Sequence, residues 1–254
     1  MKNAFIPPLL AALFTCSLEA APPKKPDGKP AAAEPKAPAA ETVDFAKFKT
    51  ADEFWDYIVK VGAETPPNAK SRDDFMQTLQ SWLTRQQTAA DAFLKKYPDD
   101  ARRWDAKVVL LMTATQLQNF GGKPLDPAAG MKELEAILAA PDATPGAKME
   151  AAYLHVQLIG QISDTDKPET LARLEKAVAS FLSAYPDGKR APEIAQMQMQ
   201  LIQMGAVPDA DAALKNLAAS KNEQIAAMAK SAIERKGKTE TDSPTPEGKA
   251  GSKK

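Results

Sequence analysis

The stretch Phe93-Leu94-Lys95-Lys96-Tyr97-Pro98-Asp99-Asp100-Ala101-Arg102 recurs 88 residues later as Phe181-Leu182-Ser183-Ala184-Tyr185-Pro186-Asp187-Gly188-Lys189-Arg190, with six of the ten positions identical. Proline ends a helix because it lacks an amide donor and disfavours helical backbone at the residue before it. Each copy therefore predicts an apolar helix that stops at a Tyr-Pro-Asp turn. The recurrence predicts a repeated structural unit.

Two weaker copies indicate a shorter period, because Leu138 lies 44 residues after Leu94. The first weak copy is Ile137-Leu138-Ala139-Ala140-Pro141-Asp142, and the second is Leu214-Lys215-Asn216-Leu217-Ala218-Ala219. Between the copies, apolar residues recur every three to four positions, which is typical of amphipathic helices. The sequence therefore predicts a leading helix near 51–61 and four helix pairs, namely 72–97 with 101–119, 127–140 with 145–162, 168–185 with 191–204, and 209–219 with 222–235.

The expected fold class is all-α. About nine helices are expected to stack as antiparallel pairs in a right-handed, TPR-like solenoid or a compact array, since one pair alone cannot bury its apolar face. Thr50 with Glu53, and Ser71 with Asp74, predict capped helix starts. Gly121-Gly122 and Gly205 predict ends of second helices.

Residues 1–20 have the pattern of a secretory signal peptide. A basic start precedes an apolar stretch, 4–14, that is too short to span a bilayer and is followed by small residues. We expect cleavage after Ala20, and an uncleaved N-terminal anchor is the alternative. Cys16 ends a Leu-Phe-Thr-Cys stretch related to a lipobox, so lipidation at Cys16 would tether the protein to a membrane surface. The expected location is the periplasm, or the outer membrane if Cys16 carries lipid.

Two further segments are expected to be disordered, because their composition offers little apolar surface to bury. They are a Pro/Ala/Lys-rich linker, 21–49, and a charged tail, 237–254. The TPR-like helical domain is expected between them, over 50–236. Cys16 is the only cysteine, so a chain cleaved after it would contain no disulfide.

The Phe-Leu-x-x-Tyr-Pro-Asp sequence at the end of one helix, followed by a second helix, resembles the tetratricopeptide-like repeats of bacterial envelope proteins. Examples are the outer-membrane assembly lipoproteins and the Tol-Pal-associated cell-division coordinators. Trp104-Asp105-Ala106, after the first Tyr-Pro-Asp, is similar to the helical N-terminal region of some thioredoxin-like envelope proteins. The resemblance covers roughly 72–235 and implies a helical-repeat fold. The chain has no Cys-x-x-Cys motif, so redox activity is not carried over.

Few residues are candidates for chemistry. His155 is the sole histidine, and one histidine cannot make a two-histidine metal site. Asp164-Thr165-Asp166 lacks the glycine and terminal glutamate of a calcium loop, which predicts an ordinary inter-repeat loop. Trp55, Trp82 and Trp104 recur at helical spacing with apolar residues, which predicts core positions. We therefore expect no catalytic site, no cofactor and no metal.

Charge also narrows the class of partner. Lys and Arg total 33 and Asp and Glu total 33, so the net charge is zero, and nucleic acid is not an expected partner. The arginines that follow the two strong turns, Arg102, Arg103 and Arg190, are expected to bond helix ends or solvent rather than an acidic partner.

The expected function is a non-catalytic, exported scaffold that mediates protein–protein interactions in the bacterial cell envelope, with its partner and binding face unassigned. Two alternatives remain open. One is an accessory module of a thioredoxin-like envelope redox system that lacks a redox motif of its own. The other is a cryptic hydrolase that uses His155, which requires a serine and a carboxylate close to that side chain.

Overall fold

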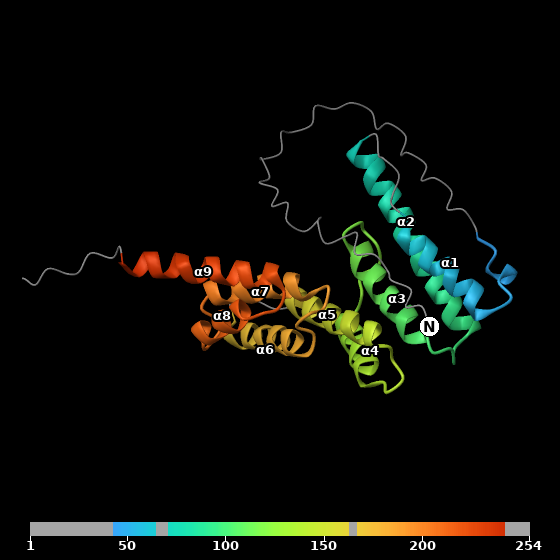
Figure 1. Ribbon diagram of the computed structural model, residues 1–254. Helices are drawn as coiled ribbons and strands as arrows, with labels where there is room; N and C mark the ends of the chain where they lie inside the picture. Colours follow the sequence, from blue (N-terminus) through green and yellow to red (C-terminus); the bar gives the residue numbers. More distant parts are fainter. Residues whose placement is uncertain (1–42, 65–70, 163–166, 242–254) are drawn as a thin grey trace, which may run out of the picture. The chain divides into compact units, whose positions relative to one another are not determined.

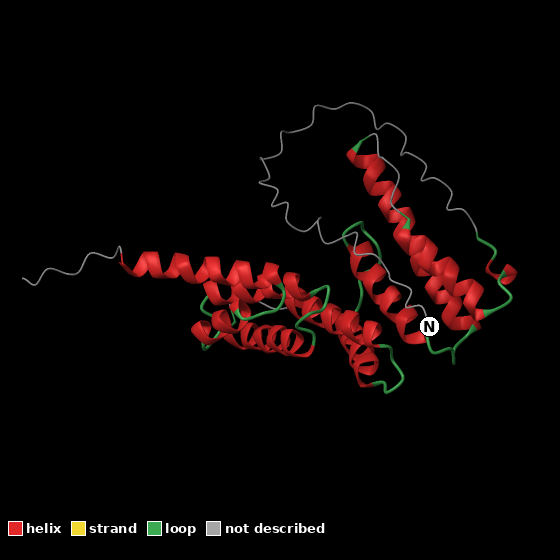
Figure 2. Cartoon of the chain, viewed as in Figure 1, coloured by secondary structure: helices red, strands yellow, loops and turns green. Residues whose placement is uncertain are grey.

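The computed structural model describes residues 43–64, 71–162 and 167–241. Within these ranges the chain consists of helices and loops, with no strand (Figure 1, Figure 2). The helices are η2 (a 3-10 helix, Phe45–Lys47), α1 (Ala51–Ala63), α2 (Arg72–Lys96), α3 (Arg103–Gln118), α4 (Pro127–Ala139), α5 (Pro145–Ile162), α6 (Pro168–Ala184), α7 (Ala191–Gln203), α8 (Ala210–Ala218) and α9 (Glu223–Thr241). The expected all-α class is therefore confirmed. The expected signal peptide, Cys16 and the expected loop at Asp164-Thr165-Asp166 lie outside the described residues.

The helices belong to two compact units. Unit 1 holds α1, α2 and α3 together with the Pro141–Thr144 loop, and unit 2 holds α4 to α9. Each expected pair packs together: α2 with α3 in unit 1, and α4 with α5, α6 with α7, and α8 with α9 in unit 2. Inside unit 2, α5 also packs on α6, and α7 packs on α9. A continuous solenoid over all the pairs stays a prediction.

Helix α1 begins where the sequence predicts. The Thr50 hydroxyl accepts a hydrogen bond from the Glu53 amide at 3.2 Å, and the Glu53 carboxylate accepts one from the Thr50 amide at 3.3 Å. This reciprocal capping box satisfies backbone donors that have no partner within the helix. Ser71 caps α2 in the same way on one side, accepting from the Asp74 amide at 3.1 Å.

Helices α3 and α7 end at glycines with left-handed backbone. Gly121 has φ +76° and Gly205 has φ +72°, a region that L-residues with a Cβ rarely adopt. At each end, the next amide bonds back to the last turn: Gly122 N to Leu117 O, and Ala206 N to Leu201 O, both at 2.9 Å. These bonds satisfy carbonyls that the helix leaves open.

The packed part of unit 1 starts earlier than the sequence predicts. The sequence places residues 43–49 in the linker expected to be disordered, yet Phe45 and Phe48 pack against the core of unit 1. The Lys96 ammonium donates to the Phe48 carbonyl at 2.6 Å and so holds this segment at the end of α2. The two phenylalanines give this segment the apolar surface by which it packs on the core.

The C-terminal boundary also differs from the expectation. Helix α9 continues to Thr241, past the end expected at 235 and into the range assigned to the tail. Ile225 and Ala229 are buried on α9, and Lys236 pairs with Asp211 of α8 at 2.6 Å. Beyond the buried turns the helix is rich in Glu and Lys, which have high helix propensity without packing.

Candidate binding groove

The two strong sequence copies fold into the same backbone turn. Tyr97 and Tyr185 each end a helix, with φ/ψ of −131°/62° and −134°/55°. Each amide donates to the carbonyl four residues back at 2.8 Å, Tyr97 to Phe93 and Tyr185 to Phe181. The turn then closes with two further backbone bonds in each copy, Asp100 N to Tyr97 O and Arg103 N to Asp100 O in the first, Gly188 N to Tyr185 O and Ala191 N to Gly188 O in the second.

The arginine that ends each copy joins the turn to the helix before the one that the turn ends, which is α1 in unit 1 and α5 in unit 2. In unit 1, Arg102 pairs with Asp100 at 2.8 Å and with Asp52 of α1 at 2.8 Å. Its guanidinium also lies 6.0 Å from the centre of the Trp55 ring on α1. Hence Arg102 bonds carboxylates of its own unit.

The same arrangement recurs in unit 2. Arg190 pairs with Glu150 of α5 at 3.3 Å and lies 4.5 Å from the centre of the Tyr153 ring. Glu150 and Tyr153 follow Asp52 and Trp55 by 98 residues each. Helix α5 therefore occupies in unit 2 the place that α1 occupies in unit 1.

This correspondence extends along both helices. At an offset of 98 residues, two buried positions of α1 and the glycine near its end correspond to similar residues of α5. They are Ile58 with Val156, Val61 with Ile159, and Gly62 with Gly160. The sequence predicts α1 as a leading helix outside the repeat. In the structure, α1–α2–α3 of unit 1 correspond to α5–α6–α7 of unit 2, as two copies of a three-helix unit.

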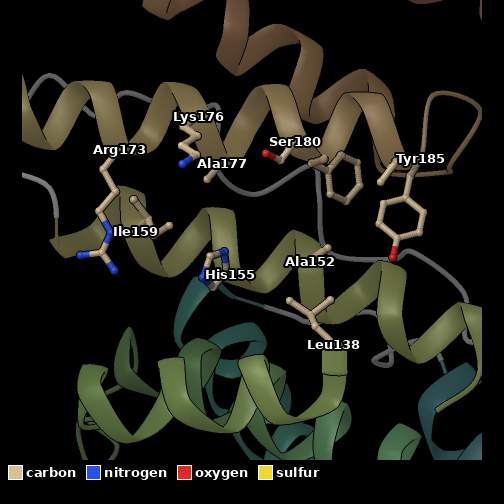
Figure 3. Close-up of a pocket in the computed structure, with 11 residues that line it drawn as sticks. Leu138, Ala152, His155, Ile159, Arg173, Lys176, Ala177, Ser180 and Tyr185 are labelled. Atoms are coloured by element: carbon tan, nitrogen blue, oxygen red, sulfur yellow. The ribbon is translucent and has the colours of Figure 1, made fainter. Parts of the chain in front are cut away.

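Between α5 and α6, unit 2 contains an open groove of about 390 Å³. Figure 3 shows its lining, with His155 rising from α5 and Arg173, Lys176 and Ser180 extending from α6. Most of the surface is apolar and comes from α4, α5, α6 and the Tyr185 turn: Leu138, Ala152, Ile159, Ala177, Phe181, Ala184 and Tyr185.

The two charged side chains that line this groove, Arg173 and Lys176, are both positive. Arg173 and Lys176 are exposed on α6, form no ion pair among the described residues, and share the lining with no carboxylate. Burial lowers the pKa of His155 from its usual 6.5; Glu135 of α4 acts to raise it, and Arg173 acts to lower it further. The groove therefore combines an apolar floor with a cationic rim.

His155 and Ser180 line the same groove, as the hydrolase alternative requires. However, in the part of the chain that the structure describes, His155 makes no hydrogen bond to Ser180 or to a carboxylate. Nucleophilic catalysis needs the base within hydrogen-bond reach of the hydroxyl, although apo sites are often looser than the reacting complex. The sequence singled out His155 but gave no indication of Ser180, which the stacking of α5 on α6 brings to it.

A second groove of about 340 Å³ lies among α6, α7, α8 and α9. Its polar lining consists of hydroxyl and amide groups from Ser183, Gln198, Asn216 and Ser220, with no charged side chain. Of these two grooves, only the one between α5 and α6 is lined by charged side chains.

Two of the three tryptophans lie in the core of unit 1, as expected. Trp55 and Trp82 are each 8% exposed, and the Trp82 indole donates to the Val61 carbonyl at 2.8 Å. The expectation for Trp104 is wrong: it is half-buried and donates to Asp142 at 3.0 Å. Arg103 and Lys107 lie 4.9 and 4.7 Å from the centre of its ring, so Trp104 holds the Pro141–Thr144 loop.

Potential metal ligands and Arg103 are the sequence candidates that remain among the described residues. Across residues 43–64, 71–162 and 167–241, no three His, Cys, Asp or Glu side chains are grouped so as to hold a metal ion. Arg103, expected to bond a helix end or solvent, pairs with Asp142 and donates to the Asp100 carbonyl at 3.0 Å.

Comparison with known proteins adds no family to this description. No family model, curated protein or solved structure matches the chain. None of the helices that the structure describes has the length and apolar character needed to cross a bilayer.

Proposed function

We propose that this protein is a non-catalytic helical-repeat scaffold of the bacterial cell envelope that binds another protein through the groove between α5 and α6. One observation carries the proposal: the groove is open, largely apolar and bordered by Arg173 and Lys176. Helical-repeat proteins bind partner segments in grooves of this kind, where apolar contacts supply affinity and charges select the partner.

The location is part of the proposal and rests on the N-terminal sequence. Export through residues 1–20 would release a chain that begins after Ala20, or would leave a lipid on Cys16. The intact mass of the protein recovered from the cells that make it separates these outcomes. A mass that retains residues 1–20 without lipid would contradict both routes and favour the uncleaved anchor.

Crosslinking in cells tests the scaffold proposal. The full chain is compared with Ala177→Trp, which places a large ring in the groove, and with Ala172→Trp, which adds the same ring at an exposed site of α6 outside both grooves. We expect at least one crosslinked protein whose recovery falls several-fold with Ala177→Trp and stays unchanged with Ala172→Trp. If no crosslinked protein depends on residue 177, the groove is not a binding site for a partner.

A cryptic hydrolase is the second candidate, because His155 and Ser180 line one groove and the charge of Glu135 on α4 acts on His155. A fluorophosphonate probe reacts with serines that an adjacent base activates. Labelling of the full chain that disappears in both Ser180→Ala and His155→Gln would support this candidate. Equal background labelling of all three proteins would exclude it.

A further inference from the structure

In unit 1, aromatic rings fill the place that corresponds to the groove. Phe54 of α1 is fully buried, and its ring centre lies 5.7 Å from that of Phe93 in an edge-on arrangement. Phe45 and Phe48 stack on Phe54 from the segment before α1, at 5.3 and 4.8 Å. Tyr57 contacts both of them, at 6.2 and 5.1 Å. A peptide segment with two phenylalanines thus packs on this face inside the chain itself.

In unit 2 the corresponding rings are missing. The residue 98 positions after Phe54 is Ala152, whereas Phe181 and Tyr185 preserve Phe93 and Tyr97 at 88 positions. Ala152, Phe181 and Tyr185 all line the groove, and Figure 3 labels Ala152 and Tyr185. A cavity of about 150 Å³ accepts a benzene ring. The groove, at about 390 Å³, has room for more than one aromatic side chain.

The two copies also differ in one ion pair, because its carboxylate has no counterpart in unit 2. In unit 1, Arg85 of α2 forms an ion pair and a hydrogen bond with Glu64, just after α1. The residue 88 positions after Arg85 is Arg173, but the one 98 positions after Glu64 is Ile162, whose side chain is 42% exposed. Arg173 therefore keeps the place of Arg85 while its carboxylate partner has been replaced by an exposed isoleucine.

Segments of this chain outside the described residues do not match the chemistry of the groove. Residues 21–42 and 242–254 contain no aromatic side chain, and the aromatic residues before them, Phe5 and Phe14, belong to the expected signal peptide. The segment with Phe45 and Phe48 already packs within unit 1. This favours a segment from another protein.

We propose that the α5/α6 groove binds a short polypeptide segment that carries an aromatic side chain close to a carboxylate. The aromatic side chain packs against Phe181 and Tyr185 over Ala152, as Phe54 packs against Phe93 in unit 1. The carboxylate pairs with Arg173, as Glu64 pairs with Arg85, and Lys176 adds a second positive charge at the rim. This inference rests on the scaffold proposal and specifies the chemistry of its partner.

A display library of random 12-residue peptides tests the inference on the full chain. We expect the peptides enriched on the wild-type protein to combine Phe, Tyr or Trp with Asp or Glu within a few residues. Ala152→Phe places a ring of the chain itself in the groove, so it should reduce the binding of those peptides at least tenfold. Ala172→Phe, which adds a ring at an exposed site of α6 outside both grooves, should leave binding unchanged.

Two charge variants test the second half of the inference. Ile162→Glu places a carboxylate at the position that corresponds to Glu64 in unit 1. It should weaken the binding of acidic peptides about tenfold and leave the binding of matched peptides with Gln in place of Glu unchanged. Met204→Glu is the matched control, since Met204 is also an exposed apolar residue, 53% exposed, and lines neither groove. Arg173→Glu changes an exposed residue, so it tests the same pairing if Ala152→Phe fails to fold. It should turn the selection toward basic peptides.

The outcomes separate this inference from the proposal it rests on. The inference would be overturned if the peptides that lose binding with Ala152→Phe show no preference for Asp or Glu. It would also be overturned if neither Ile162→Glu nor Arg173→Glu changes their binding. Both results would leave the scaffold proposal standing. Failure to enrich any peptide sensitive to residue 152 would overturn the inference, while the crosslinking comparison at residue 177 decides the scaffold separately. A molar mass that doubles in the wild type and not in Ala152→Phe would assign the groove to a second copy of the chain.

Discussion

The guanidinium of Arg190 lies 4.5 Å from the centre of the Tyr153 ring and joins the start of α7 to the middle of α5. Its charge is balanced by Glu150, at 3.3 Å, and by Glu193, at 3.1 Å. Glu193 also accepts a hydrogen bond from the Tyr153 hydroxyl at 2.7 Å. Burial together with this carboxylate raises the pKa of Tyr153 well above its usual value, so the phenol stays neutral and acts as a donor.

Replacing Arg190 with leucine should destabilise unit 2 because it leaves Glu150, whose side chain is only 14% exposed, with a single partner. Breaking a buried pair costs about 3–5 kcal/mol, and the remaining contact with Lys189 lowers the expected loss to about 2–4 kcal/mol. Urea unfolding followed by circular dichroism measures it. The control is Arg85→Leu, which breaks a more exposed pair and should cost under about 1 kcal/mol. Equal losses would show that burial does not distinguish the two pairs.

Removal of residues 1–42 should leave the free energy of unfolding unchanged, and removal of residues 1–49 should lower it. The second truncation deletes Phe45 and Phe48, two half-buried rings that stack on Phe54. Their lost burial and stacking should cost about 2–4 kcal/mol. Thermal unfolding of both truncated chains, alongside the double substitution Phe45→Ala with Phe48→Ala in the full chain, provides the measurement. If all four proteins melt together, the segment does not contribute to the fold.

Ala152→Phe should raise the stability of unit 2, because the new ring enters an existing space and needs little rearrangement of the core. Partial burial of a phenylalanine gives about 1–2 kcal/mol. The melting temperature should increase relative to wild type, and Ala172→Phe, at its exposed site, should leave it unchanged. A lower melting temperature for Ala152→Phe would mean that residue 152 does not correspond to Phe54 in packing.

Asp105 should give unit 1 a measurable pH dependence. Burial raises the pKa of this carboxyl above 3.8, although the Thr144 hydroxyl donates to it at 3.0 Å. The folded state therefore prefers the protonated form, so the contribution of Asp105 to stability is fully present below 3.8 and is lost as the pH rises through the folded pKa. Asp105→Asn keeps the acceptor without the charge. Its stability relative to wild type should increase from pH 4 upward and then level off, in urea unfolding at each pH. A difference that is independent of pH would contradict this.

His155 should make binding of acidic peptides pH-dependent. Its pKa lies below 6.5 in the free groove because of burial and Arg173, with Glu135 opposing them, and a bound carboxylate would raise it. Affinity should therefore increase as the pH falls through this range, since the imidazolium adds a third positive charge. Fluorescence anisotropy with an enriched peptide from pH 7.5 to 5.5 measures the effect. In His155→Gln the affinity should stay constant over this range, and an equal rise there would assign the titration to another group.

The helices could be predicted closely from the sequence because their ends are marked by residues with strict backbone preferences. Pro98 and Pro186 end α2 and α6 within a residue or two of the expected positions, and Gly121 and Gly205 end α3 and α7. The exceptions are the start of unit 1 and the end of α9, which continues to Thr241. At the start of unit 1, the Lys96 ammonium donates to the Phe48 carbonyl across 48 positions, and no local pattern records such a contact.

The groove could not be predicted in the same way. Its existence depends on Ala152 occupying the place of Phe54, and this comparison needs the register between α1 and α5, which the structure sets through Arg102 and Arg190. The identities shared by the two helices are too few for that register to be found from the sequence. Ser180 and Arg173 likewise look like ordinary exposed helix positions until α5 is packed beside α6.

The exchange of Phe54 for Ala152 has a consequence for how this chain can change over evolutionary time. When a unit is present twice in one polypeptide, the copy that keeps its internal aromatic rings keeps the packing that those rings provide. The other copy is then released from that constraint, and substitutions along its groove alter recognition before they threaten the fold. Divergence among related chains should accordingly concentrate around residues 152, 162 and 173, while their counterparts 54, 64 and 85 stay fixed.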